Sequence, residues 1–509
     1  MKPQRLICSI ITSICLFATS CVNNTENIQV VTSTLAPPQV SITIATAEPN
    51  AIPQPNHKTI AASITPTTDI YIPKTFYLYS AQNGDTLPTL ARRFAVDLEL
   101  LWRANSNLAR TDFLNRNTLV TVPDVDLSNS IDPFWIIPDS EIVYGPGQIN
   151  LNVEDEVKSY PDGWLWQIEA GNDYLLPGWK VVKDISMAYS VNPRILLALI
   201  EYQSGLITGM SDAESIVQYP LNVQKWHLAK LPNQLMWASE QLNAGYYGWR
   251  HGRIQQLTLA EGEQYQLDPR LNSGTVAIYS FFAQLYSQAL FEQAIGPNGF
   301  AATYEQLFGN PFNFQVDLLD PGLTQPEIAL PFEPNVIWNF TGGPHNAWRD
   351  SAPWAAIDFA PQLADPGCAK STDWIVAPAS GVISRIQDGV LAQNLGNDSS
   401  ELTGWTLVYV HLLPEKYKLR VGQNIEYGER LGRPSCEGDF ESTGTHLHLA
   451  RKYNGEWIPA SGPPTFSLGN WDVIGEHRPY RGKLHNRDSG ISIEACACVN
   501  DNQISKPHK

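Results

Sequence analysis

The sequence predicts a multidomain fold that contains a small βααβ unit, an all-α domain and a mainly antiparallel β domain. Three observations support this prediction. The chain has 509 residues, which is more than one hydrophobic core normally organises, so about three domains are expected. A strand–helix–helix–strand pattern occupies residues 76–124. Helical apolar spacing then dominates from about 160 to 312, and short strands separated by turns dominate after about 335.

The expected boundaries follow changes in composition along the chain. Residues 22–74 are rich in Thr, Ser, Pro and Ala and carry almost no charge, so we predict a flexible stalk without a core. The segments expected in chain order are a signal peptide at 1–21, the stalk at 22–74, the βααβ module at 75–124, a connector at 125–150, the helical domain at 151–325, the β domain at 326–480 and a C-terminal tail at 481–509.

The first residues predict export. Lys2 and Arg5 precede the apolar stretch 6–17, which is too short to span a membrane and has the layout of a secretory signal. The sequence ATSC that follows resembles a lipobox, in which the cysteine becomes the lipidated first residue of a bacterial lipoprotein. This resemblance implies lipidation of Cys21 and a membrane-anchored protein at the cell surface or in the periplasm. Ordinary signal cleavage near an unrelated cysteine is the alternative.

The net charge limits the classes of binding partner that are expected. The chain carries 34 basic and 51 acidic residues, which gives a formal net charge of −17. Such a balance argues against nucleic acid or an anionic membrane surface as a binding partner.

Residues 76–124 form a compact unit in which Gly84-Asp85-Thr86 is a turn that begins a helix. The motifs NGDTLPTLARRF and LVTVP in this βααβ pattern resemble a LysM module. The resemblance implies binding of N-acetylglucosamine-containing glycans, and hence of peptidoglycan, through two loops. By position these are Gly84, Asp85, Thr86 and Leu87 in the first loop, and about 107–115 in the second. A structural βααβ domain without a ligand is the alternative.

In the helical domain we expect helices at 194–203, 233–244 and 274–289, the last of them buried. The stretch SVNPRILLALIEYQSG resembles the active helix of lysozyme-like lytic transglycosylases, where a Glu before Ser-Gly is the general acid. Here Gln203 takes that place, and an amide cannot donate a catalytic proton. Glu201 projects to nearly the opposite side of the helix. The resemblance therefore implies a lysozyme-type fold without its acid, which holds glycan strands or spaces the other domains.

The segment Ser442–Ala450 reads STGTHLHLA and predicts a short strand. Because side chains alternate along a strand, His446 and His448 point to the same side. A neutral imidazole is a common zinc ligand, and a second histidine beside it can move protons. Taken alone, this motif also fits two ordinary surface histidines.

The surroundings of this motif carry a stronger resemblance. AAIDFAP at 355–361, VAPASGVI at 376–383 and His411 at the end of an apolar run precede THLH in that order. Over about 335–459 the chain resembles zinc peptidases of the M23, or lysostaphin and LytM, type. The resemblance implies a mainly antiparallel β fold, Zn²⁺ as the cofactor, and hydrolysis of peptide cross-links in the bacterial cell wall. In that family the metal ligands are the His and Asp of an H-x3-D stretch and the second His of HxH.

Carried over residue by residue, Asp358 and His448 match metal ligands, while His411 and His446 match the two histidines that assist catalysis. Trp354 stands four residues before Asp358 and cannot bind zinc. Two readings follow. Either His345, which precedes Asp358 by thirteen residues in TGGPH, enters the coordination shell from a Gly-rich turn, or the site is degenerate.

The cysteines fit an exported protein. Cys368 and Cys436 both fall within the peptidase-like region, and we expect them to form a disulfide bond there. Cys496 and Cys498 can close on each other, reach another chain or take part in a metal site.

Three functions are compatible with these motifs. The first is a lipid-anchored enzyme that holds peptidoglycan through LysM and cuts its peptides with zinc. The second is a non-catalytic LytM-like lipoprotein that activates murein amidases. The third is a protein that only anchors to the wall.

Overall fold

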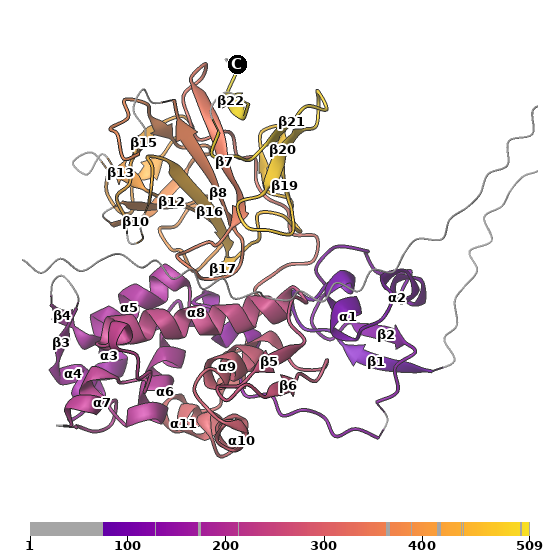
Figure 1. Ribbon diagram of the computed structural model, residues 1–509, viewed down its shortest axis with the longest axis vertical. Coiled ribbons are helices and arrows are strands. Elements are labelled where there is room, and N and C mark those ends of the chain that lie inside the picture. The colour runs from indigo at the N-terminus through magenta and orange to yellow at the C-terminus, as the bar shows by residue number, and fades with distance from the viewer. Residues whose placement is uncertain are drawn as a thin grey trace, which may run out of the picture. The chain divides into compact units, whose positions relative to one another are not determined.

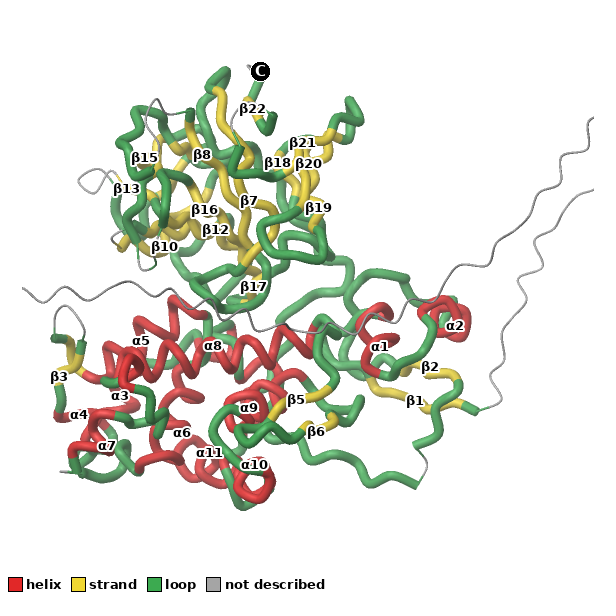
Figure 2. Tube along the Cα trace, in the orientation of Figure 1, coloured by secondary structure: helices red, strands yellow, loops and turns green. Residues whose placement is uncertain are grey.

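The computed structural model describes residues 75–507 apart from 128, 172–174, 212, 363–366, 388, 415–418, 439, 441 and 499–500 (Figure 1). The predicted signal peptide, Cys21 and the stalk lie outside the described residues. None of the described helices is long and apolar enough to cross a membrane. Helices gather in the middle of the described chain and strands in its C-terminal part (Figure 2). The expected multidomain architecture is therefore confirmed.

The first domain is the predicted βααβ module. Its elements are β1 (Phe76–Ser80), α1 (Leu87–Arg93), α2 (Leu98–Ala104) and β2 (Leu119–Pro123). The two strands pair antiparallel, with Phe76 opposite Pro123. Each helix begins at a side-chain cap, because Thr86 accepts a hydrogen bond from the Thr89 amide and Asp97 accepts one from Leu100. These local signals explain why the pattern could be read from the sequence.

The side chains of the first loop of this module, which the resemblance assigns to glycan binding, make contacts within the fold. Asp85 is fully buried and accepts hydrogen bonds from the Tyr79 hydroxyl at 2.9 Å, the Gln82 amide at 2.8 Å and Arg93 at 2.9 Å. Leu87 belongs to the module's core, and Thr86 is the buried helix cap. These side chains hold the fold together, and glycan binding by this loop stays a prediction. Gly84 has a φ of +85°, which fits the turn that glycine favours.

The helical region follows. Its helices and short strands are η1 (Asp139–Glu141), η2 (Pro146–Gln148), α3 (Val153–Lys158), α4 (Trp164–Gln167), β3 (Glu169–Ala170), β4 (Leu176–Pro177), α5 (Gly178–Tyr189), α6 (Pro193–Ser204), α7 (Glu214–Gln218), η3 (Trp226–Leu228), α8 (Leu231–Arg250), β5 (Gln256–Thr258), β6 (Gln264–Gln266), α9 (Ser273–Ala283), α10 (Gln288–Ile295), α11 (Phe300–Phe308) and η4 (Pro311–Phe314).

The predicted helices are present, but two of them end at residues other than those expected. Helix α8 runs to Arg250, six residues beyond the expected end at Ala244. The helix expected at 274–289 is two helices. Helix α9 ends at Ala283, where the amides of Gln284 and Leu285 bond the carbonyls three residues earlier, and α10 begins at Gln288. Every residue of α9 is buried, as its uniformly apolar sequence predicts.

The two residues singled out in α6 have structural partners. The Glu201 carboxylate accepts hydrogen bonds from the amides of Ile207 and Thr208 and from the Thr208 hydroxyl, at 3.0, 3.1 and 2.6 Å. It therefore fastens the loop after the helix. Gln203 accepts a hydrogen bond from the Tyr286 hydroxyl at 2.8 Å.

The C-terminal region is built from strands. They are β7 (Ile337–His345), β8 (Ala356–Pro361), β9 (Ile375–Val376), β10 (Gly381–Gln387), β11 (Val390–Asn394), β12 (Trp405–Val410), β13 (Leu412–Pro414), β14 (Asn424–Ile425), β15 (Arg430–Pro434), β16 (Leu447–Tyr453), β17 (Glu456–Trp457), β18 (Ser467–Leu468), β19 (Trp471–Gly475), β20 (Gly482–Asn486), β21 (Ser492–Glu494) and β22 (Gln503–Ser505).

The main sheet has nine strands in the order β14-β10-β11-β12-β16-β8-β7-β22, with β17 paired to β16. Its pairings are antiparallel, which confirms the predicted fold class. The register places His448 opposite both Asp358 on β8 and Val410 on β12. Three motifs far apart in the sequence therefore meet on neighbouring strands.

The segment predicted as a C-terminal tail forms strands. Strands β18 to β21 form a second antiparallel sheet, and β22 extends the main sheet by pairing with β7. Cys496 and Cys498 form a disulfide bond with each other between these strands. The predicted tail at 481–509 thus contributes three strands to the fold.

Candidate metal centre

Three potential metal ligands converge at the centre of the main sheet. The carboxylate of Asp358 comes from β8, the imidazole of His448 from β16, and the imidazole of His345 from the end of β7. One donor atom from each lies within 4.8 Å of the others. The Nε2 atom of His345 is 3.0 Å from Nδ1 of His448, and these nitrogens are 3.2 and 3.4 Å from Oδ1 of Asp358.

His345 reaches the site because β7 is irregular. Strand β7 pairs with β8 through Gly342 opposite Asp358, and the register shifts on both sides of Gly342. A Cβ on Gly342 would lie 2.5 Å from Oδ2 of Asp358, so only glycine leaves room for the carboxylate. His345 therefore enters from a bulged strand and not from the turn that the sequence suggested. Trp354 is not among the residues that line the cleft around these ligands. Its carbonyl accepts a hydrogen bond from the Ala460 amide at 2.8 Å.

Backbone carbonyls fix the orientation of the two metal-site histidines. Nδ1 of His345 lies 2.8 Å from the Gly343 carbonyl, and Nε2 of His448 lies 3.1 Å from the Ala347 carbonyl. A carbonyl only accepts hydrogen bonds, so each of these nitrogens carries the hydrogen. The opposite nitrogens, which face Asp358, are then the ones with free lone pairs. This is the outer-shell arrangement that orients histidine ligands in metal sites.

The convergence of these atoms fits a bound cation. Oδ1 of Asp358 is buried and has no hydrogen-bond partner among the described residues. Two lone pairs and a carboxylate oxygen facing one another repel unless a positive charge lies between them. Ligand atoms about 2.05 Å from a tetrahedral zinc ion are roughly 3.3 Å apart, which agrees with the spacing of this trio.

The charges in the cleft are coupled. Burial alone raises the pKa of Asp358, but His345 and His446 lower it more, so the pKa lies well below its ordinary value. Burial lowers the pKa of His345, but the Asp358 carboxylate raises it more. Burial also lowers the pKa of His448.

The two other histidines stand beside this trio. Nε2 of His446 lies 3.7 Å from Oδ1 of Asp358, and the rings of His446 and His411 are 4.5 Å apart. Their Nδ1 atoms lie 2.8 and 3.0 Å from the carbonyls of Gly444 and Glu437, so their Nε2 atoms are the free positions. Burial and the neighbouring His446 and His448 lower the pKa of His411 to about 3. His411 is therefore neutral near pH 7.

Sequence reasoning missed two aromatic residues of the cleft. The Tyr480 ring stacks on His345 with ring centroids 4.2 Å apart, and Phe440 packs against His411 and His448. Both lie in loops, with no periodic signal to reveal them. Burial raises the pKa of Tyr480, so its hydroxyl stays protonated and remains a neutral donor in the cleft.

The predicted disulfide bond borders this cleft. Cys368 and Cys436 are joined, with their Cα atoms 5.6 Å apart. The bond ties the chain after β8 to the chain before β16, and both of these strands carry metal-site residues.

Comparisons with known proteins agree with this architecture. A LysM domain model matches residues 79–123, and a model described as LasA, N-terminal domain, matches residues 135–321. Protease LasA from Pseudomonas aeruginosa strain UCBPP-PA14 is 26% identical over 337 residues, which cover 60% of this chain and 73% of the relative. LasA from a second strain is 25% identical over 336 residues, with the same coverage.

Solved structures with some likeness include pseudoalterin, described as an M23 metalloprotease from the deep sea. It is 21% identical with a TM-score of 0.28, over 34% of this chain and 96% of that chain. The catalytic domain of lysostaphin from Staphylococcus simulans is also 21% identical, with a TM-score of 0.17, over 25% of this chain and 90% of that chain.

The chain thus combines a LysM domain, a region similar to the N-terminal domain of LasA, and an M23/LasA-like peptidase region. The helical region matches the LasA N-terminal domain model, and its likeness to lytic transglycosylases stays a prediction.

Proposed function

We propose that this chain is a zinc metalloendopeptidase that hydrolyses peptide cross-links of peptidoglycan and is held at the cell wall by its LysM domain. The observation that carries the proposal is the convergence of His345, Asp358 and His448 around an unpartnered buried carboxylate oxygen. The LysM domain supplies the link to peptidoglycan, because modules of this family bind its glycan strands.

The enzyme is an M23-type metallopeptidase similar to LasA, with a His-Asp-His candidate metal site. His345, Asp358 and His448 would hold the metal. Two imidazoles and one carboxylate leave a fourth position open, which is typical of catalytic rather than structural zinc. A zinc ion in such a site acidifies a water molecule toward neutral pH and polarises a carbonyl group.

The remaining groups of the cleft would handle protons and charge. His446 offers a free Nε2 lone pair beside the trio, so it would act as the general base toward the attacking water. His411 is neutral and would accept rather than donate at Nε2. The protonated hydroxyl of Tyr480 would be the donor for the developing oxyanion.

The proposed location follows from the disulfide bonds and from the relatives. Disulfide bonds persist outside the reducing cytoplasm, and two of them join the described cysteines. This supports an extracytoplasmic protein. A signal peptide and a lipid at Cys21 complete the proposal, and they lie outside the described residues.

The alternative of a non-catalytic amidase activator rests on the missing ligand at Trp354. His345 supplies a third donor in its place. We therefore favour the enzyme.

Activity on purified peptidoglycan tests the proposal. The full chain should release cleaved stem or cross-bridge peptides, identified by mass spectrometry, and glycan-free peptides containing the same bonds should also be cut. His446→Ala should lower kcat by roughly 10²–10⁴-fold, because it removes the base, while the protein keeps its metal. A chain that is loaded with zinc but releases no peptide would refute the enzyme and restore the alternative.

A further inference from the structure

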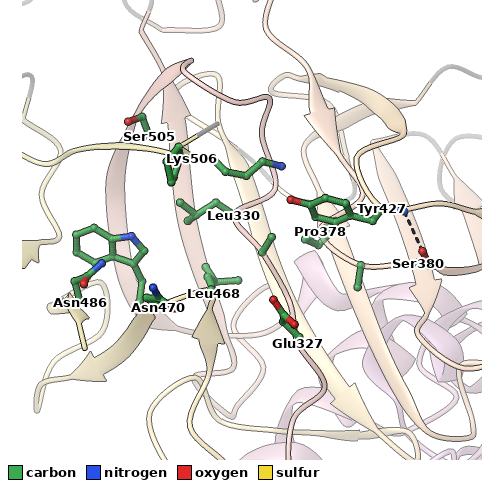
Figure 3. A pocket seen from close by; sticks show the side chains of 15 residues that line it. Glu327, Leu330, Pro378, Ser380, Tyr427, Leu468, Asn470, Asn486, Ser505 and Lys506 are labelled. Carbon is green, nitrogen blue, oxygen red and sulfur yellow. Dashed lines mark hydrogen bonds between the residues drawn. The ribbon is translucent and has the colours of Figure 1, made fainter. Parts of the chain in front are cut away.

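A second cavity lies in the C-terminal domain and shares no lining residue with the metal cleft (Figure 3). Its volume is about 620 Å³. Sites for small molecules usually measure roughly 300–1,000 Å³, so this cavity has room for a ligand of several rings.

Four segments and two single residues build the cavity. They are the entry to the domain at 327–330, the residues after β9 at 378–380 with Tyr427, the hairpin residues 468–471 with Asn486, and the C-terminal segment 505–507. Leu330, Leu468 and Pro378 present apolar side chains, while polar side chains stand at its edges (Figure 3). The cavity therefore has an apolar floor and a polar rim.

Several backbone groups around the cavity are already paired. The amide of Gly469 bonds the Ile328 carbonyl at 2.6 Å, and the amide of Ala329 bonds the Pro378 carbonyl at 2.8 Å. The Lys506 carbonyl accepts from Asn335 at 2.9 Å. An extended peptide binds mainly through backbone hydrogen bonds. With these groups in use, recognition of a ligand through side chains is favoured.

The side chains suit a sugar ring. Trp471 is half-buried and stands opposite Asn486 in the β19–β20 register, so an indole ring and an amide lie side by side. Oδ1 of Asn486 accepts hydrogen bonds from the amides of Asp488 and Ser489 at 3.1 and 3.0 Å. These bonds fix the amide plane, so that its NH₂ group is a pre-oriented donor. The exposed carboxylate of Glu327 is an acceptor for hydroxyl groups.

The charges of the lining balance. Glu327 contributes one negative charge and Lys506 one positive charge, with the Lys506 ammonium 4.9 Å from the centre of the Tyr427 ring. A lining with one charge of each sign does not favour a multiply charged ligand such as a phosphate compound. A neutral ligand with one apolar face and several hydroxyl groups fits best.

We propose that this cavity binds a short neutral saccharide, with a pyranose face against Trp471 and with its polar groups on Asn486 and Glu327. This site is additional to the LysM domain and does not depend on the proposed peptidase activity.

Site-resolved photolabelling of the full chain tests this assignment. The probe is chitotriose with a diazirine in one acetamido group, and labelled peptides are identified by mass spectrometry. Adducts should appear within 326–331, 466–472 or 484–492 and should disappear when unlabelled chitotriose is added. Trp471→Ala and Glu327→Gln should each weaken this competition by about tenfold, which corresponds to 1.4 kcal/mol. Trp226→Ala is the matched control, because that indole is 85% exposed in the helical region, and it should change nothing.

Other outcomes overturn the proposal. Adducts confined to 79–123 would place all saccharide binding in the LysM domain. Protection of the cavity from labelling by tetraglycine, and not by chitotriose, would make it a peptide site. If Trp471→Ala fails to fold, Glu327→Gln decides, because that side chain is exposed and its loss leaves the core intact. His448→Ala should abolish peptide cleavage without changing the labelling, so a failure of either proposal can be recognised separately.

Discussion

Glu401 provides the clearest quantitative prediction about stability. Its carboxylate is 3% exposed and lies between two buried cations. Nε of Arg385, on β10, donates to Oε1 at 2.6 Å, and Nζ of Lys452, on β16, donates to Oε2 at 3.1 Å. Because β16 also carries His448, this cluster helps to hold the strand that forms the metal site.

The size of the effect follows from the pKa. Burial raises the pKa of Glu401, but Arg385 and Lys452 lower it more, so it falls from an ordinary value of 4.5 to about 2. A difference of about 2.5 units corresponds to roughly 3 kcal/mol of folding free energy at pH 7. Glu401→Gln removes this contribution and leaves two buried cations unpaired, which agrees with the roughly 3–5 kcal/mol expected for breaking a buried ion pair.

The sign of the pH dependence is also fixed. Because the folded-state pKa is lowered, the contribution is complete above about pH 4.5 and is lost as the pH falls toward 2. Urea unfolding of the full chain, followed by tryptophan fluorescence, should therefore give a gap of about 3 kcal/mol between the free energies of unfolding of the native and Glu401→Gln proteins at pH 7. At pH 3 the gap should shrink to less than about half of that value.

A matched control separates this effect from a general response to charge. Glu494, on β21, is exposed, and Glu494→Gln should change the free energy of unfolding by less than about 0.5 kcal/mol. A gap for Glu401→Gln that is equal at pH 7 and pH 3 would refute the electrostatic explanation.

Three further predictions concern other parts of the chain. Tyr480→Phe keeps the ring on His345 and removes the hydroxyl, so kcat should fall by roughly 10²-fold with metal content unchanged. Tyr480→Ala should also weaken metal binding. Equal kcat for the native protein and the Phe variant would exclude the hydroxyl as the donor to the oxyanion. Replacing Cys368 and Cys436 by serine opens a cross-link across a sequence separation of 68 residues, and thermal unfolding should show a loss of about 4 kcal/mol. Asp85→Asn should cost roughly 3 kcal/mol in the LysM domain, because it leaves buried Arg93 unpaired; an unchanged melting temperature would contradict this.

Local signals explain what the sequence could predict. The βααβ module and the start of α6 are marked by capping side chains, and α1 and α6 also have a proline in their first turn. The THLH strand is marked by alternation. The choice between His345 and a degenerate site remained open, because it depends on how β7 pairs with β8 and where that pairing shifts. No local pattern contains this information.

Long-range pairing also explains the remaining differences. Strand β22 is a short polar segment whose partner, β7, lies more than 150 residues earlier in the chain. The burial of Asp85 depends on Tyr79 and Arg93, which approach it only after the module has folded. A loop that looks polar and exposed in the sequence is therefore part of the core.

Metal content tests the central claim most directly. The full chain, dialysed against trace zinc and analysed by inductively coupled plasma mass spectrometry, should retain one zinc ion per chain. His345→Ala should lose it, while His227→Ala, which removes an exposed histidine in the helical region, should retain it. Full zinc retention by His345→Ala, or no zinc in the native chain, would contradict the assignment of His345, Asp358 and His448 as the metal site.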